Sequence, residues 1–256
     1  MIRYGVLGPL RVARERPLAL IGSRKSQVAL TLMLIKATEI VSTDEMIAEI
    51  WGQSPPARAS AGIHVAISQL RKYLGSPGGT SPIVTAAPGY MLRLDGAELD
   101  LRAFQRRLER GREAARAHRD ELALRELEGA LELWRGPLLL DQRDGPQVGA
   151  FVTWAEEARL DCVEMMVDAA LRLGRHREYI GMLQRMVAEH ALHEGFHYRL
   201  MLALYRSGRR ADALLAYRAA RETLVRELGL EPGAELRRLN QAILQDERVT
   251  DLRGAA

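Results

Sequence analysis

The sequence predicts a mainly α-helical protein with small β-sheets, and two patterns along the chain lead to that prediction. The N-terminal part reads as short strands, three helices and a hairpin, in that order. From Leu101 onward the apolar spacing is helical, and similar segments recur 34 residues apart. We therefore expect a winged helix-turn-helix domain over residues 1–95, an all-α tetratricopeptide-like repeat domain over 96–246, and a disordered tail over 247–256.

Short antiparallel strands are expected first. IRYGVLGPLRV (2–12) and RPLALIG (16–22) are rich in β-forming residues, with turns at Gly8–Pro9 and Arg14–Pro17. A helix is predicted in SRKSQVALTLMLIKA (23–37), because its apolar residues recur at helical spacing and Ser23 suits the N-cap.

A second, shorter helix is predicted in STDEMIAEIWG. Ser42 suits its N-cap, Glu45 stands three residues later as in a capping box, and Gly52 ends it. QSPPA then breaks the chain. After the third helix, GSPGGTSP is a flexible connection, and IVTAAPGYMLRL reads as two strands around Pro88–Gly89. This hairpin is the expected wing.

The third helix, predicted over Ala57–Leu74, has two unlike sides. At 100° per residue one stripe is apolar, which predicts the buried side; it consists of Ile63, Ile67, Leu70 and Leu74. The opposite side has only short, hydrogen-bonding or basic residues and no acid, namely Arg58, Ala61, Val65, Ser68, Gln69 and Lys72. A solvated helix face usually carries Asp and Glu, so this side indicates insertion into the major groove of duplex DNA.

The distribution of charge along the chain also indicates a DNA-binding surface in the first part. Residues 1–96 hold 11 Lys and Arg against 6 Asp and Glu, whereas residues 97–256 hold 26 against 27. No Asp or Glu occurs between Ile50 and Leu94. A surface that meets a polyanion excludes carboxylates, because their repulsion in a close contact is costly. The alternative is a fluctuation of composition.

The repeat in the second part has the tetratricopeptide period. Gly174–Arg175 and Gly208–Arg209 are 34 residues apart. A weaker copy precedes them, in which His118 aligns with Gly174; about 22 extra residues separate this copy from the next one. PGAELRRLNQAIL, which opens with Pro232, reads as a capping helix.

The candidate DNA contacts come from three places. On the third helix, Ser68 and Gln69 are expected to read base edges, and Arg58 and Lys72 to meet bases or phosphates. His64 and Arg71 lie beside the apolar stripe; His64 either approaches a phosphate or packs beneath the wing as a neutral ring. The other candidates are Arg24 and Lys25 at the start of the first helix, and Thr85, Tyr90 and Arg93 at the hairpin.

Alternatives stay open at several of these positions. Arg24 and Lys25 are either phosphate contacts or two solvated charges, and Tyr90 is either a wing contact or part of the sheet core. Trp51 is expected in the core rather than at a ligand.

Enzyme chemistry finds no support in the motifs. The sequence has no Walker loop, no G-x-G-x-x-G after a strand and no H-E-x-x-H, so we expect no catalytic residue, no cofactor and no metal. His193 and His197 stand four residues apart, but no third ligand lies near them. The single cysteine, Cys162, excludes an internal disulfide framework and is expected in the core. With no long apolar run and no secretory signal, a cytoplasmic, nucleoid-associated protein without a membrane partner is expected.

The motifs resemble one known family. YGVLGPLRV, IAEIWGQSPPARA, HVAISQLRKYLG and IVTAAPGYML in the first part, and LELWRGPLL with LHEGFHYRLMLALYRSGRRADALLAYRAARETLVRELGLEPGAELRRLNQAIL in the second, are similar to the Streptomyces antibiotic regulatory proteins (SARP). These activators join an OmpR-type winged helix to a bacterial transcriptional activation domain. One departure is Ala191, where the family often has proline; we expect a small effect on one loop.

The resemblance implies a function and partners. It implies binding to direct repeats near the −35 element of promoter DNA, commonly as a side-by-side dimer, contact with RNA polymerase holoenzyme and its sigma factor, and activation of a secondary-metabolite (antibiotic) gene cluster. It also implies that residues 57–74 are the recognition helix and AAPGY the wing. The chain is expected to be a small member, without an ATPase module or a receiver domain. A repressor, and a protein-interaction adaptor built on the repeats, remain as alternatives.

Overall fold

We describe a computed structural model of the chain, in which residues 2–13, 22–75 and 81–246 are placed. By their contacts, the residues form two units. One contains Met1–Glu109 with Glu128–Asp161, and the other contains Arg110–Leu127 with Cys162–Ala256. The division passes through three helices, α4 (Asp100–Arg116), α5 (Asp120–Leu131) and α6 (Pro146–Arg172).

The first unit begins with a three-stranded sheet of order β2–β1–β6. β1 (Arg3–Gly5) pairs antiparallel with β2 (Arg11–Ala13) and parallel with β6 (Glu98–Leu99). The predicted first strand pair is therefore confirmed. The strand expected in residues 16–22 falls almost wholly outside the described residues. β6 was not predicted, because two residues carry no periodicity and only the pairing with β1 defines them.

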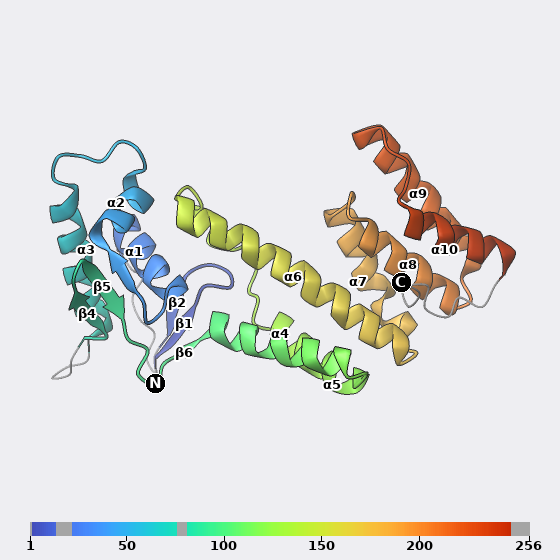
Figure 1. Cartoon of the computed structure of the whole chain (residues 1–256), viewed down its shortest axis with the longest axis horizontal. Helices are drawn as coiled ribbons and strands as arrows, with labels where there is room; N and C mark the ends of the chain where they lie inside the picture. The colour runs from blue at the N-terminus through green and yellow to red at the C-terminus, as the bar shows by residue number, and fades with distance from the viewer. Residues whose placement is uncertain (1, 14–21, 76–80, 247–256) are drawn as a thin grey trace. The chain divides into compact units, whose positions relative to one another are not determined.

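Three helices follow as predicted (Figure 1): α1 (Arg24–Ile35), α2 (Thr43–Trp51) and α3 (Ala59–Leu74). The Ser23 side chain accepts a hydrogen bond from the Ser26 backbone N–H, and Ser42 and Glu45 form the full capping box. α3 starts two residues later than expected, because the chain from Pro56 to Ala59 forms a turn closed by a backbone hydrogen bond of 2.9 Å.

The capping box also fixes the charge of Glu45. A hydrogen bond from the Lys36 ammonium, followed in importance by the Ser42 backbone N–H, lowers the pKa of Glu45 from 4.5 to about 2. Because the folded-state pKa is the lower one, the contribution of this carboxylate to stability is complete above about pH 4.5 and is lost as the pH falls toward 2.

The core of the winged helix lies between α1 and α3. All four apolar stripe residues of α3 are at most 1% exposed, as the 3.6-residue period predicted. They meet a helix that is buried along most of its length, since α1 packs against both α2 and α3.

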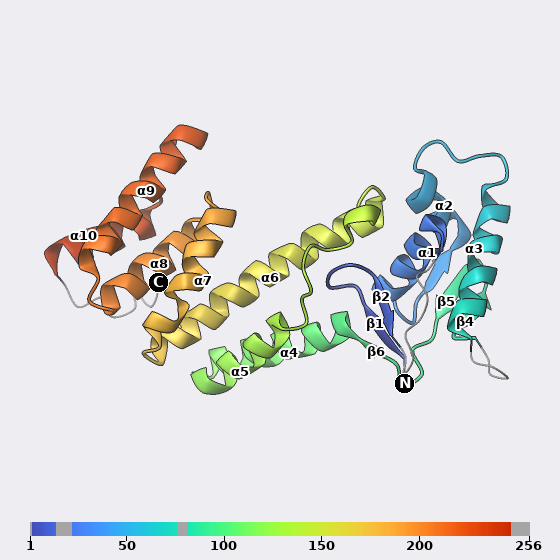
Figure 2. The same cartoon turned by 180° about the vertical axis from the view of Figure 1, so that it is seen from behind.

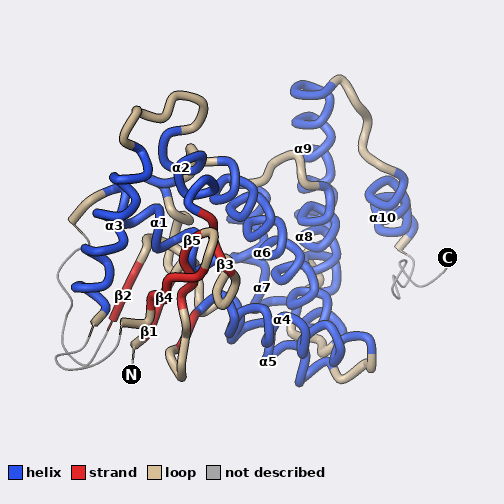
Figure 3. The backbone as a smooth tube through the Cα atoms, turned by 60° about the vertical axis from the view of Figure 1, so that its left-hand side comes forward, coloured by secondary structure: helices blue, strands red, loops and turns tan. Residues whose placement is uncertain are grey.

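A second three-stranded sheet, of order β3–β5–β4, completes the domain (Figure 3). The predicted hairpin is present as β4 (Ile83–Ala86) and β5 (Gly89–Leu92). β3 (Ile40–Ser42) was not predicted; three residues before a capping box become a strand only by pairing with β5. Gly89 lies so close to β3 that a Cβ atom there would be 2.0 Å from the Val41 carbonyl oxygen, so this position requires glycine.

The segment between α5 and α6 packs on the winged helix within the same unit. It contains a short 3-10 helix, η1 (Leu140–Gln142), whose Gln142 accepts a 2.6 Å hydrogen bond from Thr31 in α1. The Glu49 carboxylate, in a residue only 5% exposed, accepts the N–H groups of Gln147 and Val148 at 2.9 Å. Glu49 therefore caps the start of α6. This segment coincides with the extra residues that interrupt the repeat in the sequence.

In the described part of the second unit, four further helices follow (Figure 2): α7 (His176–Glu189), α8 (Glu194–Arg206), α9 (Arg210–Leu228) and α10 (Ala234–Gln245). α8 packs against α7, α9 and α10. Gly174 and Gly208 have φ of 79° and 80°, and His118 has φ of 52°. The residue after each of them donates its backbone N–H to the carbonyl five residues earlier, at 2.9 Å in all three places. The structure therefore confirms the alignment of the three copies.

A buried arginine joins α8 to α6 in the second unit. Arg199, whose side chain is 2% exposed, donates to both carboxylate oxygens of Asp168 at 2.8 and 2.6 Å and to Glu164 at 2.6 Å. Its guanidinium also donates to the Gly195 carbonyl at 3.1 Å. A guanidinium so enclosed is stable only with such partners.

We expect Arg199→Ala to destabilise the second unit by about 3 kcal/mol, because the change removes the guanidinium from two partly buried carboxylates. Urea unfolding followed by circular dichroism measures the effect. The control is Arg175→Ala, which removes an exposed pair with Glu178 and should change the stability far less. Equal losses for the two variants would show that the Arg199 pairs do not hold α8 to α6.

Candidate nucleic-acid interface

The outer face of α3 is open to solvent along its length. We define this α3 outer face by the exposed residues Arg58, Ala61, His64, Val65, Ser68, Gln69 and Lys72. It contains no carboxylate, and the first turns of both α1 and α3 lack acids, whereas α2 has Asp44 and Glu45 in its first turn. Helix N-termini without acids, beside a basic face, suit the phosphates of a duplex.

The chemistry of the face fits a major groove, which is about 12 Å wide and admits a helix with short side chains. Its exposed amide and hydroxyl are hydrogen-bonding groups for base edges, and Arg58 and Lys72 are cations for phosphates. Val65, 58% exposed, is the apolar residue at the middle of this face. Val65 is not among the predicted contacts, although the helical projection places it on this face. Its methyl groups suit the C5-methyl group of thymine.

Gln69 is held by the start of α1. Its Oε1 accepts a 3.1 Å hydrogen bond from the Ser26 hydroxyl, which in turn accepts one of 2.8 Å from the Ser23 hydroxyl. Ser26 is 2% exposed, so this chain of bonds is sheltered. With its oxygen held, the exposed Gln69 has its amide N–H groups left to donate. It therefore suits an acceptor on a base, such as guanine O6 or N7 or thymine O4. No local pattern predicts the Ser26 link, because it joins residues 43 positions apart.

Lys25 is positioned by Trp51. Its Nζ lies 4.9 Å from the centroid of the Trp51 ring, and that ring lies so close to α3 that a Cβ at Gly62 would be 3.1 Å from it. Trp51 is half-buried, so the prediction that it belongs to the core is confirmed only in part. Its other role is to hold a cation beside the start of α1.

Arg24 has acidic neighbours that the sequence did not indicate. Its guanidinium donates to the Asp141 carbonyl at 3.1 Å and to the Asp144 carboxylate at 2.5 Å. Both partners belong to the segment between α5 and α6, more than 100 positions away in the sequence. Their side chains remain largely exposed, 58% for Arg24 and 84% for Asp144. Arg24 therefore reaches a phosphate only in competition with Asp144.

At the wing, two of the proposed contacts prove to be structural. Tyr90 is 8% exposed in β5, which makes it part of the sheet core rather than a wing contact. The Arg71 guanidinium lies 5.7 Å from the Tyr90 ring and donates to the Ile83 carbonyl at 3.2 Å and to Thr85 Oγ1 at 2.7 Å. Arg71 thus joins the end of α3 to β4. Thr85 is exposed and keeps its hydroxyl proton for an outside acceptor.

The structure also decides the predictions made for Arg93 and His64. Arg93 lies beyond the end of β5 that is distant from the wing turn, and pairs with Asp95 at 2.9 Å. Arg93 is therefore not a wing residue. The sequence alone does not show which end of this strand lies at the wing turn, which is why the prediction was wrong. His64 is exposed, so the interpretation in which its ring packs beneath the wing is wrong.

The histidines and the cysteine of the second unit have local partners. His197 is 3% exposed and its Nε2 lies 2.8 Å from the carbonyl of Ala191, the residue that departs from the family pattern. Burial lowers the pKa of His197. Cys162 is buried, with its Sγ 3.6 Å from the Leu127 carbonyl. Among the described residues, no group of three or more His, Cys, Asp or Glu is placed to hold a metal ion. Within the same ranges, no helix has the length and apolarity that crossing a bilayer requires.

Comparison with known proteins gives matches over nearly the whole chain. Residues 19–92 match the model "Transcriptional regulatory protein, C terminal", and residues 99–244 match "Bacterial transcriptional activator domain". Regulatory protein DnrI of Streptomyces peucetius is 34% identical over 260 residues, which cover 99% of this chain and 96% of DnrI. The chain belongs to the Streptomyces antibiotic regulatory protein family.

Larger relatives share the same region. Regulatory protein AfsR of Streptomyces coelicolor is 37% identical over 257 residues, which cover 99% of this chain but 25% of AfsR. The solved structure of Mycobacterium tuberculosis EmbR in complex with a low affinity phosphopeptide aligns with a TM-score of 0.91 at 35% identity, over 97% of this chain and 66% of that one. The resemblance seen in the sequence is confirmed. The protein is a DNA-binding transcriptional regulator of the OmpR type, in a family of transcription factors rather than enzymes.

Replacing Asp144 with Asn should tighten binding to random duplex DNA about 1.4- to fivefold. The change removes the carboxylate that competes with a phosphate for Arg24, and an exposed ion pair contributes about 0.2–1 kcal/mol. Fluorescence anisotropy at low salt measures the affinity. Asp212→Asn, which breaks the exposed pair with Arg209 and changes the net charge equally, is the control. The same gain in both variants would mean that only net charge matters.

Proposed function

We propose that this regulator is a sequence-specific activator that binds direct repeats near the −35 element of a promoter, as a side-by-side dimer, and recruits RNA polymerase holoenzyme through its sigma factor. Its target would be a secondary-metabolite (antibiotic) gene cluster, and it would act at promoter DNA in the cytoplasm. Residues 1–95 would bind the DNA and residues 96–246 would form the activation domain. The proposed tail, residues 247–256, lies outside the described residues.

The observation that carries this proposal is the α3 outer face, exposed and free of carboxylates. Ser68, Gln69 and Val65 would supply base contacts, because their groups match major-groove edges. Arg58, Lys72, His64, Lys25 and Arg24 would supply phosphate contacts, and Thr85 would do so from the wing. Family membership supports this placement, since the OmpR-type domain model matches residues 19–92.

Activation rather than repression is supported by the second matched model, a bacterial transcriptional activator domain. α9 also leaves Leu215, Val225 and Leu228 exposed at 57%, 42% and 50%. Apolar side chains that remain in solvent suit contact with another protein. Run-off transcription with purified polymerase tests this part: the regulator should raise transcript from a promoter that it protects. A fall in transcript would identify a repressor.

Lys72→Ala and Gln69→Ala should affect DNA binding differently. Loss of Lys72 should weaken binding to all sequences and reduce the slope of log affinity against log salt by about 1, because one phosphate contact is removed. Loss of Gln69 should leave the slope unchanged and cost about 1–3 kcal/mol at one base pair. Gel shifts over a salt series, on a selected binding site and its single-base variants, separate the two effects.

Ser26→Ala gives a further control, because it leaves Gln69 present but removes the bond that holds its oxygen. Preference at the Gln69 base pair should relax without a change of the salt slope. If Lys72→Ala keeps the wild-type slope, or if Gln69→Ala weakens all sequences equally, α3 does not lie in the groove as proposed.

A further inference from the structure

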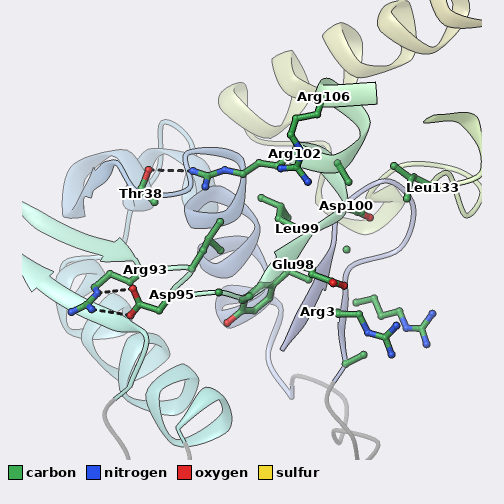
Figure 4. Close-up of a pocket in the computed structure, with 18 of the residues that line it drawn as sticks. Arg3, Thr38, Arg93, Asp95, Glu98, Leu99, Asp100, Arg102, Arg106 and Leu133 are labelled. Atoms are coloured by element: carbon green, nitrogen blue, oxygen red, sulfur yellow. Dashed lines mark hydrogen bonds and ion pairs between the residues drawn. The ribbon is translucent and has the colours of Figure 1, made fainter. Parts of the chain in front are cut away.

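A cavity of about 960 Å³ opens beside the N-terminal sheet of the first unit (Figure 4). Its walls come from β1, β2 and β6, from the residues after β5, from the first turns of α4, and from Glu132–Arg135. The α3 outer face does not contribute to it. In the view of Figures 1 and 2, α1 is drawn between α3 and this sheet, and no residue of α3 lines the cavity.

The walls of the cavity are rich in arginine. Seven arginines and four carboxylates line it, which leaves a net charge of +3. Several of these arginines are occupied: Arg93 pairs with Asp95, and Arg102 donates to the Ala37 carbonyl at 3.0 Å and to Thr38 at 3.2 Å.

Three other arginines have no partner within the described ranges, namely Arg3, Arg11 and Arg106. They come from different elements, β1, β2 and α4. In the view of Figure 4, Arg3 and Arg106 lie on opposite sides of Leu99. Guanidinium groups that line one cavity without such partners are suited to carboxylate, sulfonate or phosphate oxygens, which they bind with two parallel hydrogen bonds.

The same walls are partly apolar. Met91, Leu94, Leu99 and Leu133 line the cavity beside the arginines. Its volume lies within the range of small-molecule pockets, about 300–1,000 Å³. The lining therefore favours a molecule with an anionic group and an apolar body over a bare inorganic ion.

One wall of the cavity is held in place by partly buried hydrogen bonds and an ion pair. Asp100 accepts the N–H groups of Val6 and Leu7 at 2.9 and 3.1 Å and pairs with Arg135 at 2.9 Å. A Cβ atom at Gly5 would be 2.2 Å from the Arg135 Nη2 atom, so glycine makes room for this pair. The backbone that carries Arg3 is thus fixed before any ligand arrives, which reduces the entropy cost of binding.

We propose that this cavity binds a small amphipathic anion. Arg3, Arg11 and Arg106 hold its oxygens, and Leu94, Leu99 and Leu133 contact its apolar body. The site is separate from the DNA interface and does not depend on the proposed function.

The experiment uses 8-anilinonaphthalene-1-sulfonate as a fluorescent probe on the full chain, with neutral N-phenyl-1-naphthylamine as its uncharged counterpart. The sulfonate should bind saturably at one site, and the neutral probe at least about tenfold more weakly. Arg3→Gln and Arg106→Gln should each weaken the sulfonate about tenfold, because each removes hydrogen bonds to a charged group. Arg116→Gln, an exposed arginine of α4 outside the cavity, is the matched control and should change nothing.

Competition identifies the head group. 1-Naphthoate and 1-naphthyl phosphate should displace the probe, and the one that does so at lower concentration shows whether the natural ligand is a carboxylate or a phosphate ester. Circular dichroism and duplex binding, measured on the same samples, confirm that the variants are folded. Equal probe affinity in wild type, Arg3→Gln and Arg106→Gln, or equal affinity for the neutral probe, would overturn the proposal.

Discussion

The packing of α3 on α1 is the constraint from which the DNA interface follows. The apolar stripe of α3, from Ile63 to Leu74, is buried against α1. Burying one side of a helix determines which residues lie on the opposite side, so the residues of the α3 outer face must face solvent. Burying this stripe also fixes the spacing of α1, α2 and the wing sheet. The affinity for DNA is therefore a consequence of how the hydrophobic core is built.

Residues around α3 orient or occupy the side chains of the candidate interface. Ser26 orients Gln69, Trp51 holds Lys25, and Arg71 joins the end of α3 to the wing strand β4. The segment between α5 and α6 acts in the opposite sense, because Asp144 occupies Arg24. Positive groups that are held in place lose little entropy on binding, whereas a paired cation must first exchange its partner. In the proposed interface, preorganised groups for base contacts are thus combined with a moderated phosphate contact.

Periodicity explains what the sequence could reveal, and long-range pairing explains what it could not. The caps at Ser23 and Ser42, the α3 stripe and the shared turn at Gly174 and Gly208 are local features, and the structure confirms them. β3 and β6 exist only through their partners in the sheets.

The candidate site divides in the same way. Exposure of the outer-face residues followed from the helical period, but the burial of Tyr90, the bonds of Arg71 and the far position of Arg93 depend on how the hairpin lies against α3. The Arg24–Asp144 pair joins residues 120 positions apart, and no local pattern marks it.

Cleavage of DNA from a chelated iron on Val65→Cys tests the position of α3 most directly. The native Cys162 is buried, so the chelate attaches at the introduced cysteine alone. On a duplex that the protein protects, cuts should fall inside the protected site from Val65→Cys, and none should appear there from Gln105→Cys, an exposed position on α4 within the same unit. A bound duplex that stays uncut by Val65→Cys would contradict the placement of the α3 outer face against DNA.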